Sequence, residues 1–325
     1  MKMMALPRVP EGVLELRSRE LAAWVIPYGA RLMQLWWLGA PEGPRPLSLG
    51  FAQAQAYRED TMALGAVCGR YANRIAGAVL EREGRRWQLD VNHPLGHCLH
   101  GGRAGFGVRD WEAGQADGQS LRLHLHSPDG DQGFPGACEA EVEYKLEEFA
   151  LEWTASARTG APCPVNLVQH SYWNLDASPD LRGHLLQVHA SRYLPVDARE
   201  LPGEPLPVQA SWRDWRLPGP IPAQHVPELD SAMLLDAPAG GLREVARLQA
   251  GGLALRLLSD QPLLHLYAGG GLAPTRAPLG VEHRPGAGLC LETEAWPNGP
   301  ALGRAAWHDA QHPYLHRMRL EFGAV

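Results

Sequence analysis

Stretches in which apolar and polar residues alternate recur along this chain, and short clusters of turn-forming residues separate them. Side chains of a β-strand point to opposite faces in turn, so a period of two is typical of half-buried strands. The turns leave too little room for long crossover helices, as Ser127–Gly133 illustrates. We therefore predict an all-β protein with large antiparallel sheets. The clearest alternating stretches are Leu121–His126, Leu151–Ala155, Leu253–Leu257 and Leu320–Val325.

Helices and linkers are expected to contribute little. Only Gln53–Asp60 is predicted to form a short helix, because no apolar period of 3.6 residues persists beyond about three turns. The proline-rich stretch 200–224 could be a linker, but Trp212 and Trp215 give it apolar surface to bury. Since there is also no internal repeat, we predict a single domain over residues 1–325.

The composition excludes several classes of function. Thirty basic residues stand against 36 acidic ones, with no basic block to neutralise phosphates, so a nucleic-acid partner is not expected. No signal-peptide pattern opens the chain, and Pro27, Gly29 and Arg31 interrupt the most apolar stretch, Leu21–Leu38, so a membrane partner is not expected either. The five cysteines are scattered without a CxxC pair, which favours a reduced, cytoplasmic setting.

Two segments carry candidate acid and base residues. His170 lies between polar and aromatic neighbours after an apolar run, where an imidazole could face a cleft and exchange protons near neutral pH. Glu292 follows the apolar Leu289–Leu291, where burial could raise its pKa, and Glu294 would share its side of a strand. Taken singly, His170 could instead be a core histidine, and the two glutamates an exposed pair at a strand end.

Two groups of histidines invite a metal-binding interpretation that we do not favour. His93, His97, Cys98 and His100 lie around Pro94 and Gly96, which predict a loop rather than a helix with one shared face. Pro313 likewise interrupts the helical spacing of a second group, formed by His308, His312 and His316. We therefore predict no metal site.

Several motifs, taken in order, resemble those of the aldose 1-epimerase family, also called galactose mutarotases. Each string is short, but their occurrence together and in this order is highly specific. The resemblance runs through most of the chain. Its motifs are GRYANRI at Gly69–Ile75, LHGG at Leu99–Gly102, SPDGDQGFPG at Ser127–Gly136, PVNLVQHSYWNL at Pro164–Leu175, RYLPVD at Arg192–Asp197 and LETE at Leu291–Glu294.

The resemblance implies a galactose mutarotase-like β-supersandwich and a cofactor-free exchange of the α and β anomers of a free monosaccharide. Glu292 then matches the general base and His170 the general acid, with Tyr172 and Trp173 forming the wall beside them. Ring opening needs such a pair, because the anomeric hydroxyl loses a proton while the ring oxygen gains one. The remaining matched positions, which bind the sugar, are Asn73, Arg74, His100 and Asp230.

This chain also departs from the family pattern. Glu294 and Asn298 stand where a glutamine and an aspartate are usual, and Ser231 follows Asp230 where a histidine is common. His265 replaces a sugar-contacting glutamine. As a neutral imidazole with a pKa near 6.5, it is expected to accept a hydrogen bond from a sugar hydroxyl and to lose that ability on protonation.

Two alternative functions stay open at this point. A hexose-6-phosphate 1-epimerase of related fold would need basic side chains near the exocyclic carbon, for which Arg70 and Arg103 are available. A carbohydrate-binding module could keep the fold without turnover. The presence of both His170 and Glu292 favours an enzyme, because a sugar sensor needs no acid and base.

Overall fold

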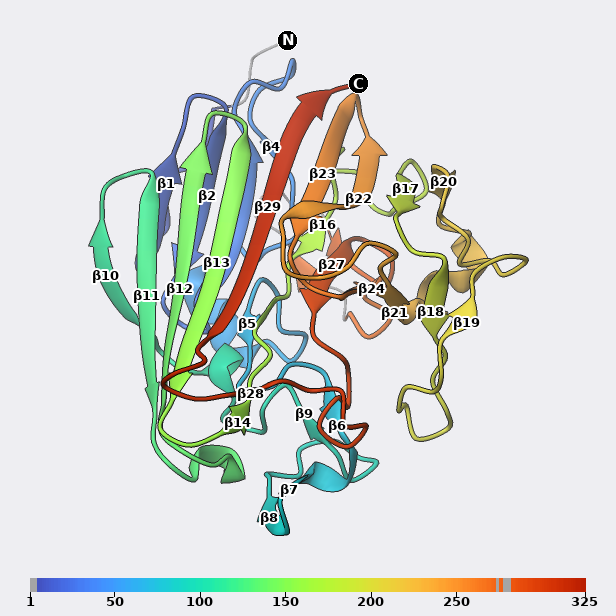
Figure 1. Cartoon of the computed structure of the whole chain (residues 1–325). Helices are drawn as coiled ribbons and strands as arrows, with labels where there is room; N and C mark the ends of the chain where they lie inside the picture. Colours follow the sequence, from blue (N-terminus) through green and yellow to red (C-terminus); the bar gives the residue numbers. More distant parts are fainter. Residues whose placement is uncertain (1–4, 273–274, 277–281) are drawn as a thin grey trace.

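A computed structural model describes residues 5–272, 275–276 and 282–325, and its largest element is a nine-stranded antiparallel sheet (Figure 1). The sheet brings the C-terminal strand β29 between β13 and β23, so it joins distant parts of the chain. In sheet order its strands are β10 (Glu112–Ala116), β11 (Ser120–Ser127), β12 (Cys138–Glu147), β13 (Ala150–Thr159), β29 (Tyr314–Ala324), β23 (Leu253–Ser259), β22 (Arg243–Ala250), β17 (Leu185–Val188) and β20 (Gly219–Pro220).

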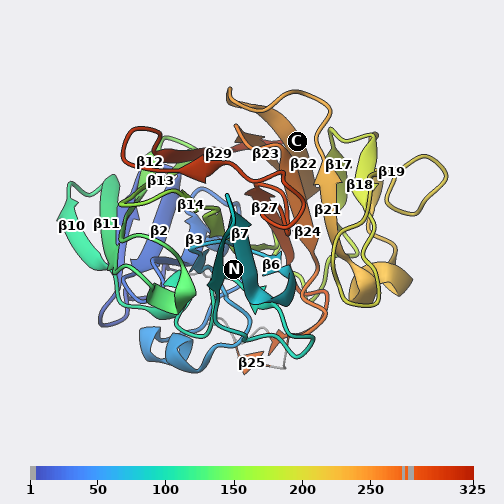
Figure 2. The same ribbon diagram turned by 60° about the horizontal axis from the view of Figure 1, so that its bottom comes forward.

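A second layer consists of two sheets joined edge to edge. A bridge between Ser48 and Trp173 connects the four-stranded sheet to the six-stranded sheet. In Figure 2 the nine-stranded sheet curves around strands of this second layer. In sheet order, the four-stranded sheet contains β1 (Leu14–Arg17), β2 (Leu21–Ile26), β3 (Arg31–Trp37) and β4 (Arg45–Pro46), and the six-stranded sheet β16 (Tyr172–Trp173), β27 (Leu289–Glu294), β24 (Leu263–Tyr267), β21 (Asp230–Leu234), β18 (Arg192–Leu194) and β19 (Leu206–Pro207).

Short elements surround the two layers. Each helix that the structure describes is a 3-10 helix: η1 (Ala54–Glu59), η2 (Ala76–Ala78), η3 (Phe106–Val108), η4 (Asp131–Gly133) and η5 (Ala223–Glu228). The five two-stranded sheets pair β5 (Val67–Cys68) with β15 (Val168–Gln169), β6 (Arg74–Ile75) with β9 (Cys98–Leu99), β7 (Val79–Arg82) with β8 (Arg85–Gln88), β14 (Cys163–Pro164) with β28 (Trp307–His308), and β25 (Thr275–Arg276) with β26 (Glu282–His283). The predicted all-β fold is confirmed, and η1 coincides with the predicted short helix.

The main core fills the space between the layers. Along β12 the apolar side chains from Cys138 to Leu146 are buried at every second position, with charged residues between them, as the alternating pattern predicts. They join one apolar cluster with residues of the second layer, among them Leu32 and Leu291. Trp215 is buried in this cluster and Trp212 packs against it, so 200–224 is a packed excursion rather than a linker.

Strand β27 is buried on both faces, and this property positions the site. Leu289 and Leu291 join the core between the layers, and Thr293 Oγ1 lies 2.8 Å from His316 Nε2 of β29. Because neighbouring side chains alternate, Cys290, Glu292 and Glu294 share the opposite face, which carries the site.

No helix in the described part of the chain is long and apolar enough to cross a membrane.

Candidate active site

A cavity of about 270 Å³ opens over β24 and β27, on the face that points away from the nine-stranded sheet. Four strands of the six-stranded sheet (β16, β21, β24 and β27) line it together with neighbouring loop segments, and most of the side chains are polar or aromatic. This combination suits a small polar ligand. The lining residues are Thr61, Met62, Ala63, Asn73, Arg74, Leu99, His100, His170, Tyr172, Asp230, His265, Tyr267 and Glu292.

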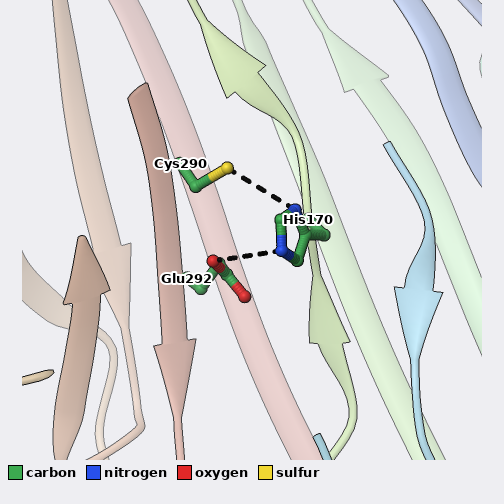
Figure 3. Close-up of side chains that lie close together, drawn as sticks. All are labelled: His170, Cys290 and Glu292. Carbon is green, nitrogen blue, oxygen red and sulfur yellow. Dashed lines mark hydrogen bonds and ion pairs between the residues drawn. The ribbon is translucent and has the colours of Figure 1, made fainter. Parts of the chain in front are cut away.

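The imidazole of His170 faces two side chains of β27 (Figure 3). Its Nε2 is 3.6 Å from Glu292 Oε1, and its Nδ1 is 3.5 Å from the sulfur of Cys290. The backbone of His170 is fixed as well, because its N–H donates to Ala66 and its carbonyl accepts from Gly65. Only 6% of His170 and 5% of Glu292 is exposed. A ligand in the cavity would therefore meet an imidazole and a carboxyl held side by side.

Burial shifts the proton affinities of this pair in opposite directions. Loss of water raises the pKa of Glu292 to about 8, because the charged carboxylate is disfavoured there. The same loss lowers the pKa of His170 to about 4, because the charged imidazolium is disfavoured. Between these values the two groups together hold one titratable proton. They can therefore act as a coupled acid and base.

Two loops meet beside this pair at Asn73 and His100. Both residues adopt left-handed backbone conformations, with φ of 64° and 50°. The Asn73 N–H donates to His100 Nδ1 at 3.2 Å, and the His100 N–H donates to the Asn73 carbonyl at 3.1 Å. Burial lowers the pKa of His100 well below its ordinary value, so its ring is neutral with the proton on Nε2.

The glycine in the second of these loops is required by a close backbone approach. A Cβ on Gly101 would lie 2.0 Å from the carbonyl oxygen of Gly69, and its φ is 86°. Only glycine avoids both the contact and the left-handed strain. The loop can thus hold His100 against the segment that carries Asn73.

Charged side chains line the far side of the cavity. Arg74 Nη2 lies 2.5 Å from Glu200 Oε2 and 3.8 Å from Asp230 Oδ2. Asp230 Oδ1 in turn lies 2.5 Å from His265 Nε2. Burial would raise the pKa of Asp230, but the hydrogen bond from His265 holds it at about 2. Asp230 therefore faces the cavity as a carboxylate.

Comparison with known proteins identifies the family. The family model described as aldose 1-epimerase matches residues 12–318. The chain belongs to the aldose 1-epimerase family. It is 32% identical to the aldose 1-epimerase of Escherichia coli K12 over 305 residues, covering 90% of this chain and 88% of that protein. It is also 32% identical to human galactose mutarotase over 297 residues, covering 87% of this chain and 85% of that protein.

Solved structures support the fold. A GalM/aldose epimerase homologue from Caenorhabditis elegans superimposes with a TM-score of 0.89 at 24% identity, covering 97% of this chain and 99% of that chain. A galactose 1-epimerase from Lactobacillus acidophilus gives a TM-score of 0.84 at 24% identity, covering 96% and 94%. The predicted galactose mutarotase-like architecture is therefore confirmed.

The structure brings all seven predicted site residues of this aldose 1-epimerase family member to the same cavity. They come from six separate parts of the chain, and Asp230, despite the unusual Ser231 beside it, is among them. Their roles in the reaction stay predictions. The seven are Asn73, Arg74, His100, His170, Asp230, His265 and Glu292.

Sequence reasoning missed several residues around the cavity. Tyr267 lines it two positions after His265, so strand alternation could have identified it. Cys290 precedes Glu292 by the same interval and contacts His170. No sequence signal pointed to the loop residues from Thr61 to Ala63.

Two expectations about aromatic side chains are wrong. Tyr172 does line the cavity, but Trp173 packs in the core, with its ring 6.3 Å from that of Phe322. Neighbouring residues of β16 must face opposite sides of the sheet.

His265 does not have the free ring nitrogen expected of a neutral imidazole, because both ring nitrogens lie close to carboxylates. These carboxylates raise the pKa of His265 well above 6.5, even though burial opposes the charge.

One group of side chains has the spacing of a metal site. In the described part of the chain, donor atoms of His170, Cys290 and Glu292 lie within 4.8 Å of one another. The two histidine groups considered from the sequence do not form such a cluster among the residues described. His100 instead lines the cavity, and His316 is buried against Thr293.

Proposed function

We propose that this chain interconverts the α and β anomers of a free aldose, with Glu292 as the base and His170 as the acid. The observation that carries the proposal is the 3.6 Å separation between Glu292 Oε1 and His170 Nε2 in a polar cavity. The anomeric hydroxyl and the ring oxygen of a pyranose are bonded to the same carbon. An acid and a base that serve both oxygens must therefore lie close together.

The reaction proceeds by ring opening and reclosure. The Glu292 carboxylate takes the proton of the anomeric hydroxyl while His170 Nε2–H protonates the ring oxygen, so the bond from C1 to the ring oxygen breaks and C1 becomes a carbonyl carbon. Rotation about the bond from C1 to C2 presents the other carbonyl face. Reclosure with the proton transfers reversed returns both residues to their starting states.

The opposed pKa shifts suit this chemistry. Between pH 4 and 8 the pair holds one proton, which in the empty cavity resides on Glu292. The reactive arrangement has the same proton count, with carboxylate and imidazolium. Because each half-reaction passes the proton between the two groups and the sugar, turnover needs no net proton exchange with solvent.

The other polar residues of the cavity would bind sugar hydroxyls. Asp230 is a carboxylate and accepts hydrogen bonds, whereas Arg74 and the Nε2–H of His100 donate. Both donors and acceptors thus line the cavity around the acid and base pair. We also infer that residues 1–325 work as one domain, since both layers contribute to one core cluster.

The phosphorylated-sugar alternative has less support. Arg70 is buried, and its guanidinium donates to the Gly136 carbonyl and the Ser127 hydroxyl. Arg103 binds Asp90 instead of reaching into the cavity. Among the described lining residues, Arg74 is the one arginine, and Glu200 already pairs with it.

Polarimetry tests the proposed function directly. Freshly dissolved α-glucose, α-galactose and other aldoses should reach equilibrium faster with the protein than without it, and Glu292→Gln should remove the acceleration. Acceleration restricted to hexose 6-phosphates would favour the phosphorylated-sugar alternative. Sugar binding without any acceleration would instead identify a binding module.

A further inference from the structure

Three ionisable side chains form a row beside the acid and base pair; those of His265 and Glu294 are buried, whereas 43% of the Asp230 side chain is exposed. His265 on β24 lies between Asp230 on β21 and Glu294 on β27, with its Nε2 2.5 Å from Asp230 Oδ1 and its Nδ1 3.2 Å from Glu294 Oε1. Only 1% of the Glu294 side chain and 10% of the His265 side chain is exposed. A buried carboxylate needs a charged or hydrogen-bonding partner, and here the imidazole serves two carboxylates at once.

The contacts of Asn73 are compatible with hydrogen on both ring nitrogens of His265. Its Oδ1 accepts from the Arg74 N–H at 2.8 Å, which orients the amide so that Nδ2 faces Glu294 Oε1 at 3.5 Å. Nδ2 also lies 3.3 Å from His265 Nδ1. When both nitrogens carry hydrogen, they both donate to Glu294 and make no hydrogen bond with each other. His265 is then an imidazolium that donates to a carboxylate from each nitrogen.

This cation lies next to the base. His265 and Glu292 are direct partners on neighbouring antiparallel strands and share the cavity face. Side chains at such positions have Cβ atoms about 4.5–5.5 Å apart. The charge on His265 lowers the pKa of Glu292, and Glu294 raises it. Other ionisable groups that interact with His265, Asp230 or Glu294 are His100, His170, Arg74, Tyr71, Tyr267, Cys290 and Tyr314.

We propose, on the basis of the function proposed above, that Glu294 and His265 are a positioning pair. Glu294 keeps His265 protonated. The imidazolium orients Asp230 toward the sugar and places a fixed positive charge beside Glu292. Glu294 touches neither the sugar nor the reacting atoms and acts through His265. Asp230 Oδ1 is committed to His265, so Oδ2 is the oxygen left for a substrate hydroxyl. An uncharged glutamine at either position would not supply this charge.

The first experiment measures the protonation of His265 without reference to turnover. Nitrogen-15 NMR of the histidine rings of the whole chain at pH 8, with His265→Gln to assign the signals, should show both ring nitrogens of His265 protonated. The same signals in Glu294→Gln should show that the proton is lost at a lower pH. A neutral His265 ring in the wild-type protein at pH 8 would overturn the proposal, whether or not the protein accelerates anomer exchange.

The second experiment measures kcat and kcat/KM against pH in the two single variants and in His265→Gln/Glu294→Gln. His265→Gln removes the cation alone, which should raise the pKa of Glu292 and move the alkaline limb of the profile to higher pH. It should also lower kcat about tenfold for each unit by which this pKa rises, because a smaller fraction of the enzyme then has the Glu292 carboxylate together with the His170 imidazolium. Removing Glu294 alone should move the alkaline limb to lower pH as long as His265 stays protonated, and the limb should match that of the double variant once His265 has lost its proton. The double variant should return the limb toward its wild-type position and recover part of the lost kcat.

A matched control separates this effect from the loss of any histidine. His126 on β11 lies 2.6 Å from Glu139 in an exposed pair outside the cavity, so His126→Gln should leave the profile unchanged. The KM of His265→Gln should rise because Asp230 loses its orienting partner. The proposal would be overturned if the alkaline limbs coincided in all variants and the effects of the two substitutions on kcat were additive. His265 and Glu294 would then only shape the wall of the cavity.

Discussion

The sulfur of Cys290 lies 3.5 Å from Nδ1 of His170, beside Glu292 on the same face of β27. Burial raises the pKa of Cys290 well above its ordinary value, so this residue is a thiol, whose sulfur can accept a weak hydrogen bond from Nδ1–H. When the His170 imidazolium gives its Nε2 hydrogen to the sugar, the neutral ring keeps its other hydrogen on Nδ1, facing this sulfur. The thiol therefore favours the ring form whose Nε2 is free to take the proton back.

Replacing Cys290 by Ala should lower kcat with little change in KM. A typical hydrogen bond contributes a net of about 0.5–1.5 kcal/mol, so the expected loss is about 2- to 10-fold. Cys290→Ser, which keeps an acceptor for Nδ1–H, should retain more activity than Cys290→Ala. Cys138→Ala, a buried cysteine of the main core, controls for the lost volume. Equal activity in the Ala and Ser variants would show that the thiol only fills space.

The pH dependence of turnover should follow the proton count of the acid and base pair. Below about pH 4 both His170 and Glu292 are protonated and no base is present; above about pH 8 both are deprotonated and no acid is present. A plot of kcat/KM against pH should therefore be bell-shaped, with limbs near these two values. An alkaline limb below pH 6 would contradict the raised pKa of Glu292.

The sequence predicted the site best where a single strand determines the geometry. Alternation along β27 correctly placed Glu292 and Glu294 on one side, and applied to β16 it would have separated Tyr172 from Trp173. The same rule would also have added Cys290 and Tyr267. These residues were overlooked, but the signal for them was in the sequence.

The environment of His265 could not be predicted in this way. Its partners Asp230 and Glu294 come from strands on either side of β24, so they become neighbours only through sheet order and register. A pKa near 6.5 was the expectation for an isolated ring, and two carboxylates from distant segments changed it. Long-range pairing therefore decides the chemistry of this residue.

Substitution of either member of the acid and base pair should nearly abolish anomer exchange. His170→Asn removes the group that protonates the ring oxygen, and Glu292→Gln removes the base, so each should lower kcat by about 10²- to 10⁴-fold. Sugar binding, measured by calorimetry or tryptophan fluorescence, should stay detectable in both variants. Near-normal polarimetric rates in one of them would exclude that residue from the mechanism.

Chelation should leave the activity unchanged, because the proposed proton transfers need no metal ion. Preincubation with EDTA followed by polarimetry checks this, with a buffer-only sample as the control. The donor atoms of His170, Cys290 and Glu292 are close enough to hold an ion. Loss of activity in EDTA that added metal restores would therefore point to these three residues, and Cys290→Ala should then weaken the restoration.

Glu292→Gln should also make the protein more stable at neutral and alkaline pH. The pKa of Glu292 is about 8 in the folded protein, against an ordinary value of 4.5, so unfolding at pH 7 releases a proton. This release lowers the free energy of unfolding by about 3 kcal/mol compared with a protein that has a non-titrating residue at this position. Because the folded-state pKa is raised, the wild-type protein keeps its full stability below pH 4.5 and loses this contribution as the pH rises toward 8.

The test is the difference in unfolding free energy between Glu292→Gln and the wild type, measured in urea from pH 4.5 to pH 8. This difference should grow with pH in favour of the variant, by at most about 3 kcal/mol at pH 7 because the amide must also be buried. The same exchange at Glu139, whose side chain is 69% exposed, should change stability by less than about 0.5 kcal/mol. A difference that does not vary with pH would mean that Glu292 has an ordinary pKa. The carboxyl would then be ionised at neutral pH without any help from His265.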